Sequence, residues 1–291
     1  MGENATISLR NRLTNVAARV VLGGAMLVPY ERRVRLVGWI FSRLVAPVAG
    51  WQTRIRDNLR HVLPELSHAE RERIVRNVPN NVGRTLIEIY SGEEFIARIK
   101  DAPLVGPGVA ALEAAKTSDK PLVLMTAHIG NYDAVRGSLA RQGLEMAALY
   151  KEMTTAAFNT HYVKAISVIA TPVFPTNSKG IPGLVRHLRD GGTIGIVADV
   201  GSRKSPILSF FGQDARTPLS AAEWALKFDA TVIPVYGVRN ADGLTFELFV
   251  DTPIAPGTPE DMMQRYNDSV EALVRENLDQ WFWIHRRWKG T

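Results

Sequence analysis

His128 and Asp133 are the two residues whose types and spacing most clearly allow chemistry. They lie five positions apart in the stretch Thr126-Ala127-His128-Ile129-Gly130-Asn131-Tyr132-Asp133. A carboxylate on one imidazole nitrogen fixes the tautomer of a histidine, and the other nitrogen is then free to take a proton from a hydroxyl. The pair is therefore a candidate general base. The alternative is a histidine that caps a helix and has no chemical role.

The flanking sequence predicts how this pair is positioned. Pro121 to Met125 reads PLVLM, an apolar run of the kind found in buried strands, and Tyr132 to Ala140 has the pattern of a helix. Across a strand-to-helix turn the chain can fold back and bring Asp133 to His128, and Gly130 supplies the backbone freedom that such a turn needs. In open α/β sheets this edge is where ligands bind.

The second part of the chain alternates apolar runs with helical patterns, which indicates an α/β fold with a mainly parallel sheet flanked by helices. Asn240-Ala-Asp-Gly243 joins the alternating runs 232–239 and 244–250 as a hairpin, so we expect a mixed sheet with one antiparallel pair. The strand candidates are 121–126, 146–150, 171–174, 193–198 and 231–238.

Charged residues follow several of these strands. Lys151 follows MAALY, Asp199 follows TIGIVA, and Arg239 follows IPVYGV. Because the carboxyl ends of parallel strands meet at one edge of a sheet, we expect these side chains to gather there with His128. Each of them taken alone is better explained as a solvated strand end, and it is their number that favours a site.

Two helix starts carry capping signals. Ser67 and Glu70 have the spacing of a capping box, and Thr258 precedes a proline and two acidic residues. The buried stripe of the second helix is predicted to consist of Met262, Tyr266, Val270 and Leu273.

Composition and charge narrow the class of protein. The 291 residues suit one large α/β domain with an appendage, and the absence of cysteine excludes disulfides and thiolate nucleophiles. Residues 1–60 hold ten arginines and three acids, an excess of +7, whereas the whole chain carries +6. These arginines alternate with apolar residues, which favours an anionic membrane surface over a nucleic acid as partner.

We therefore expect residues 1–52 to form basic amphipathic helices on a membrane, and residues 53–291 to form the α/β domain, with a helical lead-in at 53–120. The uncharged run Val20 to Tyr30 is too short to span a bilayer of about 30 Å. A single tilted span and a cleaved signal peptide are the alternatives.

The motif and several other segments resemble one family. HIGNYD is similar to the His-x-Gly-Asn-Trp-Glu box of the late lipid A acyltransferases, which lie within the His-x4-Asp/Glu glycerolipid acyltransferase superfamily. The chain departs from the family pattern after Lys151, where a proline is missing, and at Val200, which replaces glutamine. Further similarities run, with gaps, from about residue 54 to 289: NLRHVLPEL, Tyr150-Lys151, Asp199, Phe210-Phe211-Gly212 with Ala215 and Thr217, Pro234 with Arg239, and Trp281 to Lys289.

The resemblance implies an enzyme that moves an acyl chain from an acyl carrier protein thioester to a hydroxyl of a Kdo-bearing lipid A precursor. It implies the cytoplasmic face of the bacterial inner membrane and no metal or bound cofactor. His128 would act as general base and Asp133 would orient it. Either the backbone amides after His128 or a side-chain cation, that of Lys151 or Arg239, would stabilise the oxyanion. The expected substrate-binding residues are Gly130, Asn131, Lys151, Asp199, Arg216 and Arg239.

Several alternatives stay open at this point. The acceptor could be a lysophospholipid or an aminolipid, or the chain could be a non-catalytic lipid-binding protein of the membrane surface. Arg239 could instead be a structural ion-pair partner of Glu247 across the hairpin. The terminal WFWIHRRWK could lie at a lipid interface or pack its tryptophans on the core, and His285 within it is not assigned as a second base.

Overall fold

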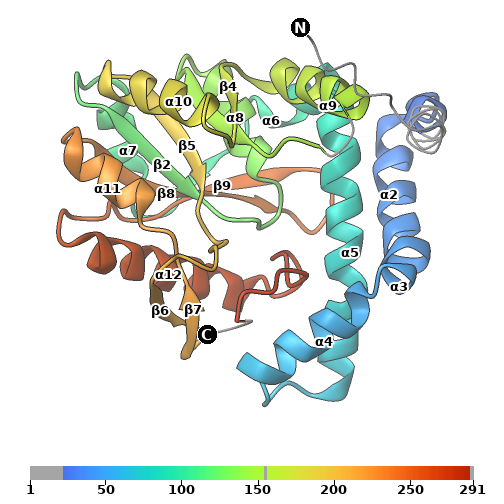
Figure 1. The fold of residues 1–291 in the computed structure, drawn as a ribbon. Helices are drawn as coiled ribbons and strands as arrows, with labels where there is room; N and C mark the ends of the chain where they lie inside the picture. Colours follow the sequence, from blue (N-terminus) through green and yellow to red (C-terminus); the bar gives the residue numbers. More distant parts are fainter. Residues whose placement is uncertain (1–21, 154–155, 289–291) are drawn as a thin grey trace, which may run out of the picture.

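A seven-stranded mixed sheet forms the centre of the molecule. The computed structural model describes residues 22–153 and 156–288. The strand order is β1-β9-β8-β2-β5-β3-β4, with β8 and β9 antiparallel and the other neighbours parallel (Figure 1). This confirms the expected fold class, including the hairpin. The strands are β1 (Leu104–Val105), β2 (Leu122–Thr126), β3 (Met146–Tyr150), β4 (Val173–Pro175), β5 (Thr193–Val197), β8 (Thr231–Arg239) and β9 (Phe246–Val250).

Helices cover both faces of this sheet (Figure 1). The helices of the structure include α2 (Tyr30–Ile40), α3 (Ala46–Val48), α4 (Trp51–Val62), α5 (His68–Tyr90), α6 (Glu93–Ile99), α7 (Val109–Lys116), α8 (Tyr132–Arg141), α9 (Ala156–Ile169), α10 (Gly180–Arg189), α11 (Ser220–Lys227) and α12 (Pro259–Glu276).

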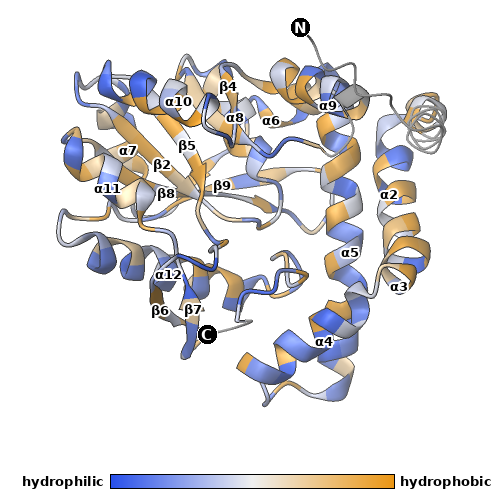
Figure 2. Ribbon diagram, in the orientation of Figure 1, coloured by the Kyte–Doolittle hydropathy of each residue, from blue (hydrophilic) through white to orange (hydrophobic). Residues whose placement is uncertain are grey.

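Alternate residues of β2 divide the apolar core in two, because successive side chains of a strand point to opposite faces. Val123 and Met125 pack in a cluster with α10, α11 and α12. Leu122 and Leu124 pack in a second cluster with α7, α8 and α9. Figure 2 shows the apolar strands between these helices. β2 is therefore buried on both sides, as its continuous apolar sequence predicts.

The capping predictions are confirmed. Ser67 and Glu70 form a reciprocal capping box at the start of α5, and the Thr258 hydroxyl accepts a hydrogen bond from the backbone N–H of Asp261 at the start of α12. The predicted stripe of α12 is buried along its whole length. The helix after the motif begins at Tyr132, and its N-cap is Asn131, whose side chain accepts from the backbone N–H of Asp133.

A small hairpin was not predicted from the sequence. β6 (Ile207–Phe210) and β7 (Gln213–Arg216) form a separate two-stranded sheet. Their two connecting residues, Phe211 and Gly212, both have positive φ, at 56° and 66°. Two-residue hairpin turns favour this conformation, which glycine adopts readily and phenylalanine seldom does, so only one of the two positions carries a turn signal.

The N-terminal helices pack along α5, on the side away from the sheet (Figure 1). α2 continues through a π-helical segment at Phe41–Val45 into α3. Among the described residues, no helix combines the length and the apolar character that crossing a bilayer requires. Residues 1–21, which carry three of the arginines, lie outside the described part. The predicted division at residue 52 and the predicted membrane association stay predictions.

Candidate active site

Asp199 is the carboxylate that reaches His128. The two residues follow β2 and β5, which are adjacent parallel strands, so their side chains meet at the carboxyl edge of the sheet. Oδ1 of Asp199 lies 2.8 Å from Nδ1 of His128, and Oδ2 accepts hydrogen bonds from the His128 backbone N–H and from Trp281 Nε1, both at 2.9 Å. Nε2 of His128 is thereby left as the nitrogen that can accept a proton.

Electrostatics keep this carboxylate ionised. Burial by itself raises the pKa of Asp199, but the charge and hydrogen bonds of His128 and the charge of His285 outweigh it and hold that pKa below its usual range. The His128 side chain is 30% exposed, whereas that of Asp199 is only 2% exposed. The pair therefore combines a partly accessible imidazole with a buried carboxylate that holds its Nδ1.

Asp133 does not take the predicted place beside His128. Its carboxylate pairs with Arg136 at 2.8 Å, one helical turn further along α8, and Arg136 also donates to the carbonyl oxygens of Ile166 and Ala170. Because Asn131 is the N-cap of α8, Asp133 lies in the first turn of that helix, where its side chain faces the residue three positions later, Arg136. The predicted contact is corrected to Asp199, and a catalytic role for Asp133 stays a prediction.

The backbone after His128 is held by hydrogen bonds to other segments. Gly130 has a φ of 52°, and a Cβ there would lie 2.0 Å from the Gly237 carbonyl oxygen. The N–H of Gly130 donates to Gln280, and the N–H of Asn131 donates to Gly237. Gly130 and Asn131 thus fix the loop within the protein, and their predicted contact with substrate stays untested.

An apolar cavity of about 520 Å³ opens beside His128. It lies between the sheet and helices α8 and α9, and its walls include Leu124, Ala148, Ile166 and Gly195. The polar residues at the cavity are Thr126, His128, Tyr132, Asp133, Arg136, Tyr150, Lys151, Tyr162, Thr176 and His285. Such a pocket, mainly apolar with a few polar groups, is typical of small-molecule and lipid sites.

The cavity also contains buried phenols. Burial raises the pKa of the Tyr132 phenol well above its ordinary value, and it raises the pKa of Tyr162 to about 12. Both groups are therefore neutral at physiological pH and act as hydrogen-bonding groups rather than as bases.

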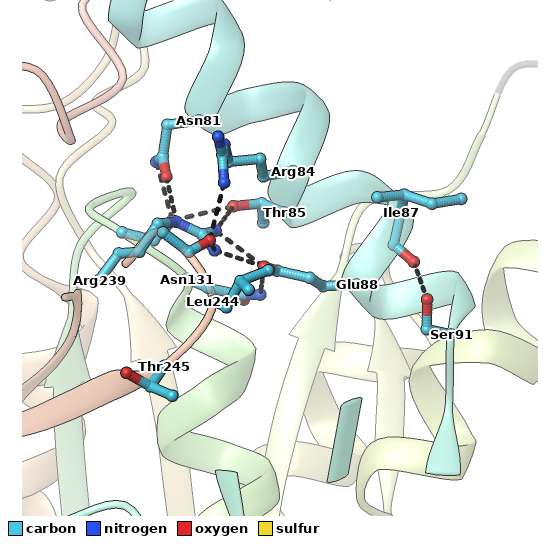
Figure 3. Close-up of polar contacts among 12 residues, drawn as sticks. Asn81, Arg84, Thr85, Ile87, Glu88, Ser91, Asn131, Arg239, Leu244 and Thr245 are labelled. Atoms are coloured by element: carbon cyan, nitrogen blue, oxygen red, sulfur yellow. Dashed lines mark hydrogen bonds and ion pairs between the residues drawn. The ribbon is translucent and has the colours of Figure 1, made fainter. Parts of the chain in front are cut away.

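Arg239 is engaged inside the protein. Its guanidinium forms a two-pronged ion pair with Glu88 on α5 and donates to Asn81 at 2.7 Å (Figure 3). It also lies over the Phe246 ring. Glu88 in turn accepts from Asn131 of the motif at 2.9 Å. The predicted role in binding substrate phosphate does not agree with this burial.

The alternative of a structural ion pair holds for Arg239, although the predicted partner was wrong. Arg239 lies opposite Phe246 in the hairpin register, whereas Glu247 lies opposite Val238 and is exposed on the other face. Since side chains alternate across a strand, the pairing with Glu247 is excluded by one residue of register.

The other predicted cations lie in different surroundings. Lys151 is exposed at the cavity, as expected for a residue at the end of β3. Arg216 is half-buried at the end of β7, and its guanidinium donates to the Ser205 carbonyl oxygen at 3.0 Å. Of the predicted strand-end group, Asp199 contacts His128, and Lys151 lines the same cavity as His128, while Arg239 turns toward α5.

The C-terminal segment packs on the core, which agrees with the second of the two alternatives given for it from the sequence. Trp281 and Trp283 are fully buried, and Arg287 donates to Thr217 and Asn267 inside the protein. Phe282 donates its backbone N–H to the His128 carbonyl oxygen at 2.9 Å. The final lysine of the motif, Lys289, lies outside the described residues.

His285 was not assigned any role from the sequence. Its ring centroid lies 4.8 Å from that of His128, and it lines the same cavity. Burial and the nearby charge of His128 lower the pKa of His285 to about 4, so its imidazole is neutral at physiological pH. One nitrogen or oxygen atom from each of His128, Asp199 and His285 lies within 4.8 Å of the other two. Imidazole and carboxylate groups are ligand types that Zn²⁺ accepts.

Comparison with known proteins decides the family. The model of the bacterial lipid A biosynthesis acyltransferase family matches residues 9–290. The chain belongs to this family. It is therefore an acyltransferase of lipid A biosynthesis.

Two curated relatives of this lipid A acyltransferase come from Haemophilus influenzae (strain ATCC 51907 / DSM 11121 / KW20 / Rd), and both are lipid A biosynthesis acyltransferases. One is 24% identical over 269 residues, covering 88% of this chain and 81% of the relative. The other is 24% identical over 266 residues, covering 87% and 81%. Among solved structures, the 1-acyl-sn-glycerophosphate (LPA) acyltransferase PlsC from Thermotoga maritima matches with 14% identity and a TM-score of 0.37, covering 86% of this chain and 99% of that one.

Proposed function

We propose that this acyltransferase moves a fatty acyl chain from an acyl carrier protein thioester to a hydroxyl of a Kdo-bearing lipid A precursor, with His128 as general base. The observation that carries the proposal is the His128–Asp199 pair at an apolar cavity. Asp199 replaces Asp133 as the orienting carboxylate in this mechanism.

The reaction requires one proton acceptor and no protein nucleophile. Nε2 of His128 takes the proton of the acceptor hydroxyl as its oxygen bonds to the thioester carbon. The tetrahedral intermediate then expels the thiolate of the carrier protein, which recovers a proton from the imidazolium. Asp199 stabilises that imidazolium and keeps Nδ1 protonated, which is the role of the carboxylate in His-containing triads.

The cavity is suited to the acyl chain of the donor. Its walls come from β2, β3 and β5 of the sheet and from α8 and α9. Each methylene transferred from water into such a site contributes about 0.8 kcal/mol. His128 lines the same cavity, so a chain bound there would bring its thioester to the base.

The anionic acceptor needs cations near the base, and exposed ones are present. Lys151 lies at the cavity, and Arg203 and Lys204 are exposed in the segment that follows Asp199. We assign the phosphate and acidic-sugar contacts to these residues in place of Arg239. Guanidinium and ammonium groups form charge-assisted hydrogen bonds with phosphate, which are about twice as strong as neutral ones.

A membrane-facing surface completes the proposal. Leu36, Trp39, Leu44 and Val48 on the N-terminal helices are 44%, 52%, 56% and 92% exposed, although all are large apolar residues. Exposed arginines lie among them, at positions 32, 35 and 43. An apolar helix face with interleaved cations is typical of interfacial helices on anionic membranes. We place this surface on the cytoplasmic face of the inner membrane.

The test is transfer by the purified full-length protein in mixed micelles, with an acyl carrier protein thioester as donor. A Kdo-bearing lipid A precursor and a lysophospholipid are compared as acceptors. We expect transfer to the former, and loss of transfer in His128→Ala. Higher turnover on the lysophospholipid would reject the proposed acceptor but keep His128 in its role. Transfer that survives His128→Ala would reject the mechanism.

A further inference from the structure

Acyl transfer develops negative charge on the thioester carbonyl oxygen, and an enzyme stabilises it with a preorganised donor. The nearest backbone donors are already used inside the protein. The N–H of Ile129 donates to Ala127 at 2.8 Å, that of Gly130 to Gln280 at 3.1 Å, and that of Asn131 to Gly237 at 2.9 Å. The His128 N–H donates to Asp199. The expected oxyanion donors after His128 are therefore occupied.

Two charged side chains that were expected to stabilise the oxyanion are poorly placed to do so. Arg239 is held by Glu88 and Asn81, and it does not line the cavity. Lys151 lines the cavity but is exposed, so its ammonium is well solvated and not preorganised. Arg136 also lines the cavity, but its guanidinium already donates within the protein. The remaining candidates for a fixed donor beside His128 are the neutral side chains at the cavity.

His285 has the required properties. Its Nε2 atom is buried and has no hydrogen-bond partner among the residues that the structure describes. A buried donor without a partner costs free energy, which a ligand at that point would offset. The residue itself is fixed, because its carbonyl oxygen accepts from Asn58 Nδ2 at 2.7 Å and its ring packs edge-on against Phe282.

We propose that Nε2–H of His285 donates a hydrogen bond to the thioester carbonyl oxygen and stabilises the oxyanion as His128 deprotonates the acceptor. This inference rests on the proposed acyl transfer and adds a second catalytic residue to it. The neighbouring cavity then holds the acyl chain, His128 acts as the base, and His285 acts as the hydrogen-bond donor.

Neutrality of His285 fits this role. Two charged imidazoles whose rings lie 4.8 Å apart would repel each other, and the imidazolium of His128 forms during the reaction. A neutral imidazole donates a hydrogen bond without adding a second positive charge, as in other enzymes that use a neutral histidine to polarise a carbonyl.

The test compares His285→Phe with His285→Gln in the full-length protein. Phenylalanine keeps the ring packing and removes the donor, whereas the glutamine amide nitrogen can replace Nε2. We expect His285→Phe to lower kcat by about 10²–10³-fold with little change in KM for the thioester. His285→Gln should recover a substantial part of kcat.

His187 supplies a matched control. Its Nε2 is likewise buried without a partner among the described residues, but it does not line the cavity. His187→Phe should leave kcat and KM unchanged, and thermal unfolding of all variants should show folded proteins. A His285→Phe variant that is folded and retains kcat would overturn the inference.

A Lys151→Met variant tests whether Lys151, rather than His285, donates to the oxyanion. If Lys151→Met lowers kcat by the larger factor and His285→Gln gives no recovery, the donor is Lys151 and the inference fails. The proposed function is judged by His128→Ala alone. Retained transfer in that variant would reject the mechanism, whereas loss in His128→Ala with normal kcat in His285→Phe would reject only the role of His285.

Discussion

Asp199 lies 71 residues after His128 in the chain, yet its Oδ1 is 2.8 Å from Nδ1 of that histidine. The acid of the HX4D motif, Asp133, is instead paired with Arg136 in the first turn of α8. The two carboxylates thus differ in their partners: Asp199 contacts the proposed base, and Asp133 pairs within α8. This difference can be tested by neutral substitutions that keep side-chain size.

Asp199→Asn should impair transfer mainly through kcat, because the amide no longer favours the tautomer with a free Nε2 on His128 and no longer stabilises the imidazolium. We expect a loss approaching that of His128→Ala, in the range of about 10²–10⁴-fold for a general base. Steady-state rates with the thioester donor measure it. Asp133→Asn is the matched comparison, and an equal or larger kcat loss there would return the orienting role to Asp133.

Arg239→Ala should destabilise the protein rather than act on acceptor binding. It leaves the carboxylate of Glu88, which is fully buried, without its cation, and such a loss typically costs about 3–5 kcal/mol. Chemical denaturation measures the free energy of unfolding. Combining Arg239→Met with Glu88→Gln should cost less than the sum of the single changes. Strict additivity would show that the two side chains are not coupled.

Gly130→Ala should disrupt the motif loop. At a φ of 52° the new Cβ would lie 2.0 Å from the Gly237 carbonyl oxygen, so the loop has to move. Gly50→Ala is the control, because Gly50 has a φ of 68° and open space around its Cβ position. The free energy of unfolding of Gly50→Ala should fall by about 1–2 kcal/mol, which is the cost of a left-handed conformation for a residue with a Cβ. Unfolding curves that show equal losses for both variants would contradict the close approach.

Stability should fall as pH is lowered below about 6.5, partly because of His285. Its folded-state pKa is lowered to about 4 from 6.5, so between these values the unfolded chain binds more protons than the folded protein. Stability therefore rises with pH through this window and is lost as pH falls. The shift corresponds to an upper bound of roughly 3 kcal/mol. His285→Gln removes the group, and its unfolding free energy should vary less between pH 4 and 6.5; an unchanged slope would argue against the shift.

Binding to anionic vesicles should depend on the N-terminal surface. Leu36→Asp places a charge on the exposed face of α2 and should weaken sedimentation with vesicles that contain anionic lipid. Ile207→Asp is the control, since Ile207 is 45% exposed and Leu36 is 44% exposed, but Ile207 lies on β6. High salt should weaken wild-type binding, because exposed charges are screened within about 8–10 Å. Equal binding by both variants would contradict a lipid contact at α2.

Local patterns predicted the elements of this fold well. The buried strand before His128, the helix from Tyr132, and the caps at Ser67 and Thr258 follow from hydrophobic period and hydrogen-bonding residue types. These features depend on neighbours in the sequence. The hairpin at Phe211 escaped prediction because the first of its two turn residues is a phenylalanine, which seldom adopts positive φ.

The partners within the site could not be predicted in the same way, because they depend on strand order and register. Nothing in the sequence states that β2 lies beside β5, and this adjacency selects Asp199 over Asp133. Likewise, Arg239 pairs with Glu88 on a distant helix, whereas hairpin reasoning pointed to Glu247. His285 shows no chemical signal in the sequence, since the feature that singles it out is a buried Nε2 with no partner among the described residues.

The C-terminal segment completes the loop that carries the base. Gln280 accepts the N–H of Gly130, Trp281 donates to Asp199, and Phe282 donates to the His128 carbonyl oxygen. A chain that emerges from the ribosome N-terminus first makes the motif long before these residues. Even a fully folded sheet would therefore present an incomplete site during synthesis. Activity should begin only when residues 280–285 have left the exit tunnel.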